Sequence, residues 1–202
     1  MITETKKSER IAINKYNFDW SSTGIIMALI VMCIIFSVTT KSFLSPNNFA
    51  NISRQISIVG ICAVGMTMVI LTGGIDLSIG SLIGLTSVTA ATMMSNEFPI
   101  WIAVLLTLLL GVAVGALNAA IINIFKVPPI ITTLGTMISL RGVVYIITGG
   151  MPIYGLPEKF KVLGQGSIGI IPISVIIMVI VFVFGYVLLN KTPFGRRIYG
   201  IG

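Results

Sequence analysis

The chain has 202 residues, of which 55% are hydrophobic and only 9% are charged, and its mean hydropathy is +1.05. A water-soluble domain carries about 25% charged residues because its surface faces water, so this composition excludes a soluble globular protein. The net charge of +7 does not indicate nucleic-acid binding, because the basic residues lie at the ends of apolar segments and form no basic face.

Six apolar segments are each about 20 residues or longer, the length that crosses a ~30 Å hydrocarbon layer. The first follows a polar stretch and has no cleavage pattern of small residues after it, so we expect it to be a span and not a signal peptide. The sequence therefore predicts an all-α integral membrane protein, a bundle of about six transmembrane helices. These helices are expected near residues 22–40, 53–72, 76–94, 100–124, 129–148 and 170–189.

The distribution of Lys and Arg favours a cytosolic N-terminus, because more of them fall in the segments that would then be cytosolic. An even number of spans returns the chain to the cytosol at Lys191. We therefore predict a cytosolic tail over residues 1–21, a transmembrane domain over 22–190, and the start of a cytosolic loop over 191–202.

One carboxylate interrupts the apolar sequence. Asp76 follows Gly73 and Gly74 in the stretch GMTMVILTGGIDLSIGSLIG, residues 65–84. A carboxylate that faces lipid is costly, so Asp76 needs water, a cavity or backbone donors. One interpretation is a hairpin turn in which the glycines end one helix and Asp76 caps the next. The other is a helix broken inside the membrane, whose N-terminus faces a polar pathway. The pattern alone favours the turn and leaves both open.

The helix after Asp76 carries hydroxyl groups on one face, at Ser78, Ser81 and Thr89. Such a face suits a path for neutral polyols, although interhelical hydrogen bonding is the commoner use of these residues. Small residues at intervals of four predict faces on which neighbouring helices pack closely. They are Gly80 and Gly84 in this helix, and Gly111, Gly115 and Ala119 in the next.

Arg141 is the one charged residue inside a predicted span. It lies ~22 Å along the helix from Lys126, since each residue adds about 1.5 Å. Its side chain either extends to the outer surface or contacts substrate or a partner at the outer mouth of a pathway. Thr132 and Thr136 lie on a different face of the same helix.

The sequence contains no histidine, which excludes His-based acid–base chemistry and His-rich metal sites. Cys33 and Cys62 lie inside apolar segments and are interpreted as small buried hydrophobic residues. We predict no catalytic residue, no cofactor and no metal site.

Three segments resemble the membrane subunits of ribose-type ABC sugar importers, in the same order and at the same spacing. They are GMTMVILTGGIDLSIGS (65–81), VPPIITTLGTMISLRGVVYIITGGMPI (127–153) and TPFGRRIYGIG (192–202), and the similarity runs from about residue 22 to the end. The resemblance implies helices that dimerise around a substrate path, two cytosolic ATPase partners and an extracytoplasmic sugar-binding protein. The sequence has no G-x-x-x-x-G-K-[ST] loop, so ATP hydrolysis is expected on the partner.

In that family, the segment around FGRRIY leads into a cytosolic coupling helix that docks on the ATPase. The resemblance therefore assigns Phe194, Gly195, Arg196 and Arg197 to the approach to the ATPase contact. The two arginines are equally well explained as anchors to anionic lipid. The coupling helix is expected to begin near Gly202, so we expect the chain to be a fragment or a split gene product.

The sequence thus predicts the permease subunit of an ATP-driven importer of a ribose-like monosaccharide in the bacterial cytoplasmic membrane. The alternative is a truncated membrane protein with an assembly or regulatory role. A secondary transporter would need coupling-ion carboxylates within its spans, and Asp76 is the only candidate. The sugar itself stays open. The predicted pathway residues are Asp76, Ser78, Ser81, Thr89, Thr132, Thr136 and Arg141.

Overall fold

A computed structural model describes residues 20–202 of the chain. Most of the predicted cytosolic tail lies outside these residues; its last two begin the first helix. The described chain divides into two compact units, one that ends at Asn48 and one that runs from Phe49 to Gly202. In the first unit, α1 (Trp20–Thr39) is an apolar helix whose large side chains are mostly exposed. A polar turn then leads to the start of α2 (Pro46–Leu71).

The start of α2 differs from the prediction, which placed it near residue 53. Ser45 accepts a hydrogen bond from the backbone N–H of Asn48 at 3.2 Å, and Pro46 occupies the first helical position. A serine cap followed by proline is a favoured helix start, because proline lacks the N–H that would have no partner there. Local capping chemistry therefore begins the helix in a segment that hydropathy assigned to a loop.

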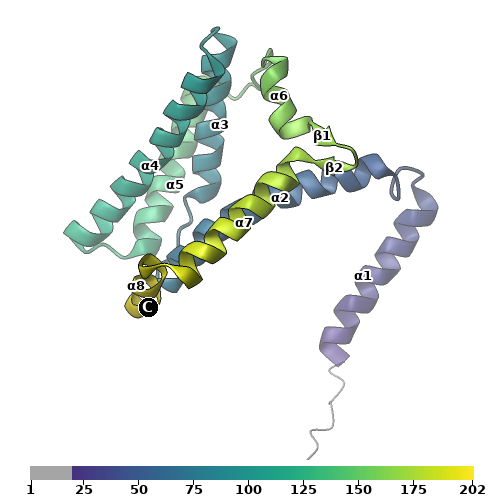
Figure 1. The fold of residues 1–202 in the computed structure, drawn as a ribbon, viewed down its shortest axis with the longest axis horizontal. Helices are drawn as coiled ribbons and strands as arrows, with labels where there is room; N and C mark the ends of the chain where they lie inside the picture. Colours follow the sequence, from purple (N-terminus) through teal and green to yellow (C-terminus); the bar gives the residue numbers. More distant parts are fainter. Residues whose placement is uncertain (1–19) are drawn as a thin grey trace, which may run out of the picture. The chain divides into compact units, whose positions relative to one another are not determined.

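Three helices of the second unit form its main packed group: α3 (Ile79–Ser95), α4 (Ile100–Phe125) and α5 (Pro129–Thr148). α3 packs against both of the others, as Figure 1 shows. Leu85, Val114 and Leu140 form a buried cluster with one residue from each helix. Lys126 adopts a left-handed conformation (φ 55°) after α4, and Pro129 begins α5. This tight connection places the end of α4 beside the start of α5.

The rest of the chain forms a short connecting segment and two further helices. α6 (Glu158–Gln165) is followed by an antiparallel pair of two-residue strands, β1 (Ser167–Ile168) and β2 (Ile171–Pro172). α7 (Ile173–Lys191) then packs against α6, and α8 (Pro193–Ile201) packs against α7. The segment predicted as the start of a loop over 191–202 is therefore mostly helical.

α2 and α7 contact each other through two glycines. A Cβ added at Gly60 would lie 2.7 Å from the Sδ of Met178, and one added at Gly185 would lie 2.5 Å from Cγ1 of Val64. Only glycine lets the two helices approach this closely without displacing those side chains. The contact is an example of the small-residue packing that membrane helices use.

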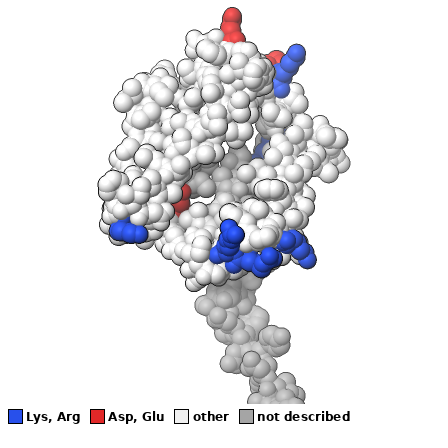
Figure 2. Space-filling model, turned by 60° about the vertical axis from the view of Figure 1, so that its left-hand side comes forward, with Lys and Arg blue, Asp and Glu red and all other residues white. Residues whose placement is uncertain are grey.

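The surface of the described chain is that of a membrane protein. Four helices are long and apolar enough to cross a bilayer, namely α2, α4, α5 and α7, and α1 and α3 contribute shorter apolar stretches. Large hydrophobic side chains such as Ile124, Ile146 and Phe184 are more than half exposed. Figure 2 shows most of the charged side chains toward the two ends of the face in view, with one acidic and one basic side chain between them where the surface is hollowed. The all-α membrane fold predicted from composition is confirmed.

Candidate functional site

The candidate site begins where α2 ends. Gly73 has a φ of +77° and donates its N–H to the carbonyl of Ile70, while the N–H of Gly74 donates to the carbonyl of Val69. A left-handed residue at a helix C-terminus is favourable for glycine, which has no Cβ to clash. The two glycines therefore end α2, and the backbone stays non-helical until α3 begins at Ile79.

Asp76 organises the start of α3 through one of its carboxylate oxygens. Its Oδ1 accepts a hydrogen bond from the backbone N–H of Ser78 at 2.7 Å and another from the Ser78 hydroxyl at 2.6 Å. Ser78 is the N-cap residue of α3 and is buried. Because its only hydroxyl proton goes to Asp76, the Ser78 oxygen is left with acceptor capacity toward other helices.

A chain of hydrogen bonds continues from Ser78 into the neighbouring helices. The amide nitrogen of Asn118 in α4 donates to the Ser78 hydroxyl oxygen at 3.2 Å, and the hydroxyl of Thr136 in α5 donates to Asn118 Oδ1 at 2.6 Å. Asn118 is only 5% exposed. A buried amide without partners is costly, and here both of its ends are satisfied. Asp76, Ser78, Asn118 and Thr136 therefore form one polar network that joins three helices.

The network lies deep relative to the connection between α4 and α5. Asn118 is about two helical turns before Phe125, the last residue of α4, and Thr136 is about two turns after Pro129, the first of α5. At ~1.5 Å per residue, the network is ~10 Å from that connection. α3 thus begins well inside the three-helix group and not level with Lys126. This depth favours the broken-helix interpretation of the Asp76 segment over the surface turn.

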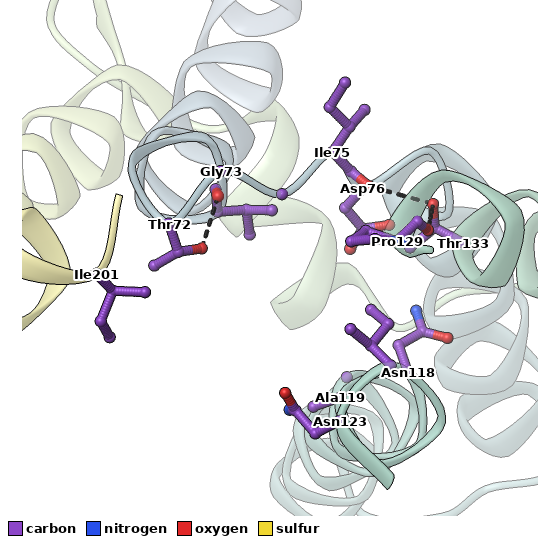
Figure 3. Close-up of a pocket in the computed structure, with 14 residues that line it drawn as sticks. Thr72, Gly73, Ile75, Asp76, Asn118, Ala119, Asn123, Pro129, Thr133 and Ile201 are labelled. Atoms are coloured by element: carbon purple, nitrogen blue, oxygen red, sulfur yellow. Dashed lines mark hydrogen bonds between the residues drawn. The ribbon is translucent and has the colours of Figure 1, made fainter. Parts of the chain in front are cut away.

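A cavity of about 450 Å³ lies beside the network. Asp76, Asn118, Asn123 and Thr133 supply polar groups to its lining, and Ile201 of α8 also lines it (Figure 3). The Thr133 hydroxyl donates to the carbonyl of Pro129 at 2.8 Å and lies 3.3 Å from the carbonyl of Ile75. No Lys or Arg is among the lining residues. The cavity therefore offers hydroxyl, amide and carboxylate groups among apolar ones.

The other predicted pathway residues are placed elsewhere. Arg141 Nε donates to the hydroxyl oxygen of Ser81 at 3.3 Å, which links α5 to α3 in a second polar contact. Thr132 is buried, and its hydroxyl has no hydrogen-bond partner among the described residues. Thr89 is half-buried. Neither threonine lines the cavity. The structure therefore brings together Asp76, Ser78 and Thr136 from the predicted set, and pairs Ser81 with Arg141.

The glycines predicted to be helix-packing positions are open in this chain. A Cβ added at Gly80, Gly84, Gly111 or Gly115 would meet no atom within 4 Å among the described residues. Gly115 and Ala119 line the cavity. Since no described helix covers the four glycines, their packing role stays a prediction, and it requires residues or a chain beyond those described here.

Sequence reasoning missed several residues of the site. From the sequence, Asn118 and Asn123 are interpreted as buried amides that need partners, whereas Thr133 and Ile201 have no assigned role. The structure buries Asn118 but leaves Asn123 exposed. An amide in an apolar helix is a detectable signal, because it must find a partner. Ile201 carried no such signal, since it reaches the cavity only through the path of the chain.

α8 is held against the end of α7 by its first residues. Thr192 caps it, accepting the N–H of Gly195 at 3.4 Å, and Pro193 is its first residue. A Cβ on Gly195 would overlap the carbonyl oxygen of Leu189. Among the residues that the resemblance assigned to the ATPase approach, Gly195 is thus buried in this contact. Phe194, Arg196 and Arg197 are exposed.

Comparison with known proteins agrees with this architecture. Residues 48–202 match the family described as "Branched-chain amino acid transport system / permease component". The chain belongs to this permease family. The match covers all elements from α3 onward and nearly all of α2, so the family assignment rests on the part of the chain that builds the network.

Individual relatives of this permease are named for sugar import. The chain is 41% identical to the ribose import permease protein RbsC of Bacillus subtilis, over 100% of this chain and 63% of that relative. It is 42% identical to RbsC of Haemophilus influenzae, over 87% of this chain and 56% of that relative. It is 36% identical to the galactose/methyl galactoside import permease protein MglC of Salmonella typhimurium, over 95% and 63%. The resemblance to ribose-type permeases is confirmed.

The permease chain described here is shorter than these relatives. It spans 63% of the length of the Bacillus subtilis relative and 56% of the Haemophilus influenzae one. No solved structure matches the chain.

Proposed function

We propose that this chain is part of the permease subunit of an ATP-driven importer that carries a ribose-like monosaccharide across the bacterial cytoplasmic membrane. The observation that carries the proposal is the network from Asp76 through Ser78 and Asn118 to Thr136, placed ~10 Å inside the helix group beside a cavity. The names of the relatives, several of them ribose import permeases, support the same substrate class.

The composition of the site favours a neutral polyol over an amino acid. An amino acid is a zwitterion, and its carboxylate needs a cation or several N–H donors when it leaves water. The cavity is lined by one carboxylate and by no Lys or Arg. Hydroxyl and amide groups instead match the hydroxyls of a sugar. A monosaccharide is therefore the better fit, although the family description refers to branched-chain amino acids.

The proposed orientation places the N-terminus, the Lys126 connection and α8 on the cytosolic side. α8 then presents Phe194, Arg196 and Arg197 to a cytosolic ATPase subunit, which performs the hydrolysis. The outer segment around α6 faces an extracytoplasmic sugar-binding protein. A second permease subunit covers the open glycine face that includes Gly111 and Gly115. Transport then occurs by alternating access of the helix group.

The test is uptake of labelled ribose into proteoliposomes that contain the full-length permease and its ATPase, with the sugar-binding protein outside. Ribose uptake that needs internal ATP and is not reduced by excess leucine supports the proposal. Uptake that needs a proton or sodium gradient in place of ATP overturns it. Leucine uptake without ribose uptake also overturns it, because the substrate class is then wrong.

A further inference from the structure

The cavity beside Asp76 contains polar groups that the protein fold does not use. Only Oδ1 of Asp76 is engaged by Ser78; its Oδ2 makes no hydrogen bond within the described part of the chain. The Asn123 side-chain amide likewise has no partner among the residues that the structure describes, and this side chain is exposed. Asn118, in contrast, uses both ends of its amide in the network. The polar groups around the cavity are therefore of two kinds. Some are used in hydrogen bonds of the fold, and others have no partner among the described residues.

The free groups have the chemistry that recognises vicinal hydroxyls. A carboxylate oxygen accepts hydrogen bonds from hydroxyl groups, and an amide both donates and accepts. The Thr133 hydroxyl oxygen, whose proton is used within α5, adds a further acceptor. Apolar residues such as Ile122 complete the wall and suit the C–H faces of a sugar ring. The volume of about 450 Å³ lies within the roughly 300–1,000 Å³ usual for small-molecule sites.

We propose that this cavity is a binding subsite for a single neutral polyhydroxylated molecule, with Asp76 and Asn123 as its hydrogen-bonding residues. The inference rests on the proposed function and adds to it the place where the sugar is held within the permease. Asn123 lies less than one helical turn from the end of α4. In the proposed orientation, the subsite is therefore near the cytosolic end of the pathway, where solute leaves the protein.

Helix α8 also supplies part of the lining of the subsite. Ile201 lines the cavity, and a Cβ on Gly202 would overlap the carbonyl oxygen of Leu71 at the end of α2. The C-terminal end of α8 thus rests directly on α2, next to the break that carries Asp76. A shift of α8 relative to α2 therefore changes the subsite itself.

The experiment measures protection of a cysteine placed in the cavity. Cys33 and Cys62 are first replaced by alanine in the full-length permease, and Asn123→Cys is introduced. Labelling by a water-soluble maleimide is followed in proteoliposomes with increasing ribose, and with leucine as the non-polyol comparison. The matched control is Asn190→Cys. Asn190 is an exposed amide in the last turn of α7, and its one hydrogen bond within residues 20–202 goes to the carbonyl of Tyr186 in the same helix.

Ribose at about ten times its dissociation constant is expected to slow labelling of Asn123→Cys about tenfold, with no effect on Asn190→Cys and none from leucine. Two results overturn the subsite. One is labelling at the same rate with and without saturating ribose. The other is a complete lack of labelling, which means that residues outside the described chain fill the cavity.

A second variant separates the subsite from the proposed function. Asn123→Leu should lower the rate of ribose uptake about three- to tenfold, the effect of losing about one hydrogen bond to substrate. Asn190→Leu should leave uptake unchanged. Normal uptake by Asn123→Leu refutes the subsite while the parent chain still transports ribose, so the proposed function survives. If the parent chain transports no sugar, the proposed function fails first.

Discussion

The hydroxyl of Thr136 donates a 2.6 Å hydrogen bond to the amide oxygen of Asn118, and this bond joins α5 to α4 about two turns away from their connection. The same amide donates to Ser78, which Asp76 holds at the start of α3. The break between α2 and α3 is therefore built into the helix group, and the following predictions test this arrangement.

Replacing Asp76 with leucine should abolish uptake. The variant removes the acceptor for the N–H and hydroxyl of Ser78, and it removes a carboxylate from the lining of the cavity. Uptake of labelled ribose by the full-length chain measures the effect, and membrane fractionation checks that insertion is intact. Asp76→Asn is the control, because it keeps an acceptor oxygen and should retain part of the activity. Normal uptake by Asp76→Leu would leave only the surface-turn interpretation.

Asn118→Leu should destabilise the helix group by about 2–4 kcal/mol. It leaves the buried hydroxyl of Ser78 and the half-buried hydroxyl of Thr136 each without one partner, and an unsatisfied buried group costs about 1–3 kcal/mol. Thermal or SDS-induced unfolding in detergent measures the loss. Asn123→Leu should change stability by less than about 0.5 kcal/mol, since Asn123 is exposed. Equal stability of the two variants would contradict the network.

Gly185→Ala should weaken the contact between α2 and α7 by about 1–3 kcal/mol, the usual cost of overpacking. Its Cβ would lie 2.5 Å from Cγ1 of Val64. Val64→Ala removes that atom, so the double variant should recover much of the loss, and a double-mutant cycle measures the coupling. Gly111→Ala is the matched control in the isolated chain, because its added Cβ meets open space. An additive double variant would argue against this contact.

The two explanations for the α8 arginines predict different losses. If Arg196 and Arg197 contact the ATPase, changing both to glutamate should reduce co-purification of the ATPase with the full-length permease, most strongly at low salt. If they only anchor the helix to anionic lipid, the ATPase is retained and the dependence on anionic lipid is lost. Lys126→Glu is the control, as a cation that also lies on the predicted cytosolic side. Retention of both properties would refute both roles.

Hydropathy predicted the membrane fold well because the length of an apolar run is a direct consequence of bilayer thickness. Its failures are local. Helix α2 starts early because Ser45 and Pro46 form a cap, and the segment after Lys191 folds into α8 because Thr192 does the same. Each cap involves only one or two residues, so its signal is lost when hydropathy is averaged over a long window.

The site was only partly predictable, for a different reason. Asp76 and Ser78 stand out because a carboxylate and an adjacent hydroxyl interrupt an apolar run. The roles of Asn118 and Thr136 could not be predicted, because their hydrogen bond depends on how α4 is aligned against α5. Ile201 reaches the cavity through tertiary packing alone. The contact between α2 and α7 uses Gly60 and Gly185, which belong to no repeat at intervals of four and carried no signal in the sequence. The packing role of the repeated glycines stays a prediction.

The close contact between Gly195 of α8 and the backbone of Leu189 in α7 has a mechanical consequence. Because α7 and α8 are in close contact there, we expect a displacement of α8 to move α7 as well. α7 contacts α2 at two places, where Gly60 of α2 meets Met178 and where Gly185 of α7 meets Val64. The C-terminal end of α8 contacts the end of α2 at Leu71. We therefore expect a displacement of α8 to reach the end of α2, next to Gly73 and Gly74, by two routes: directly at Leu71 and through α7.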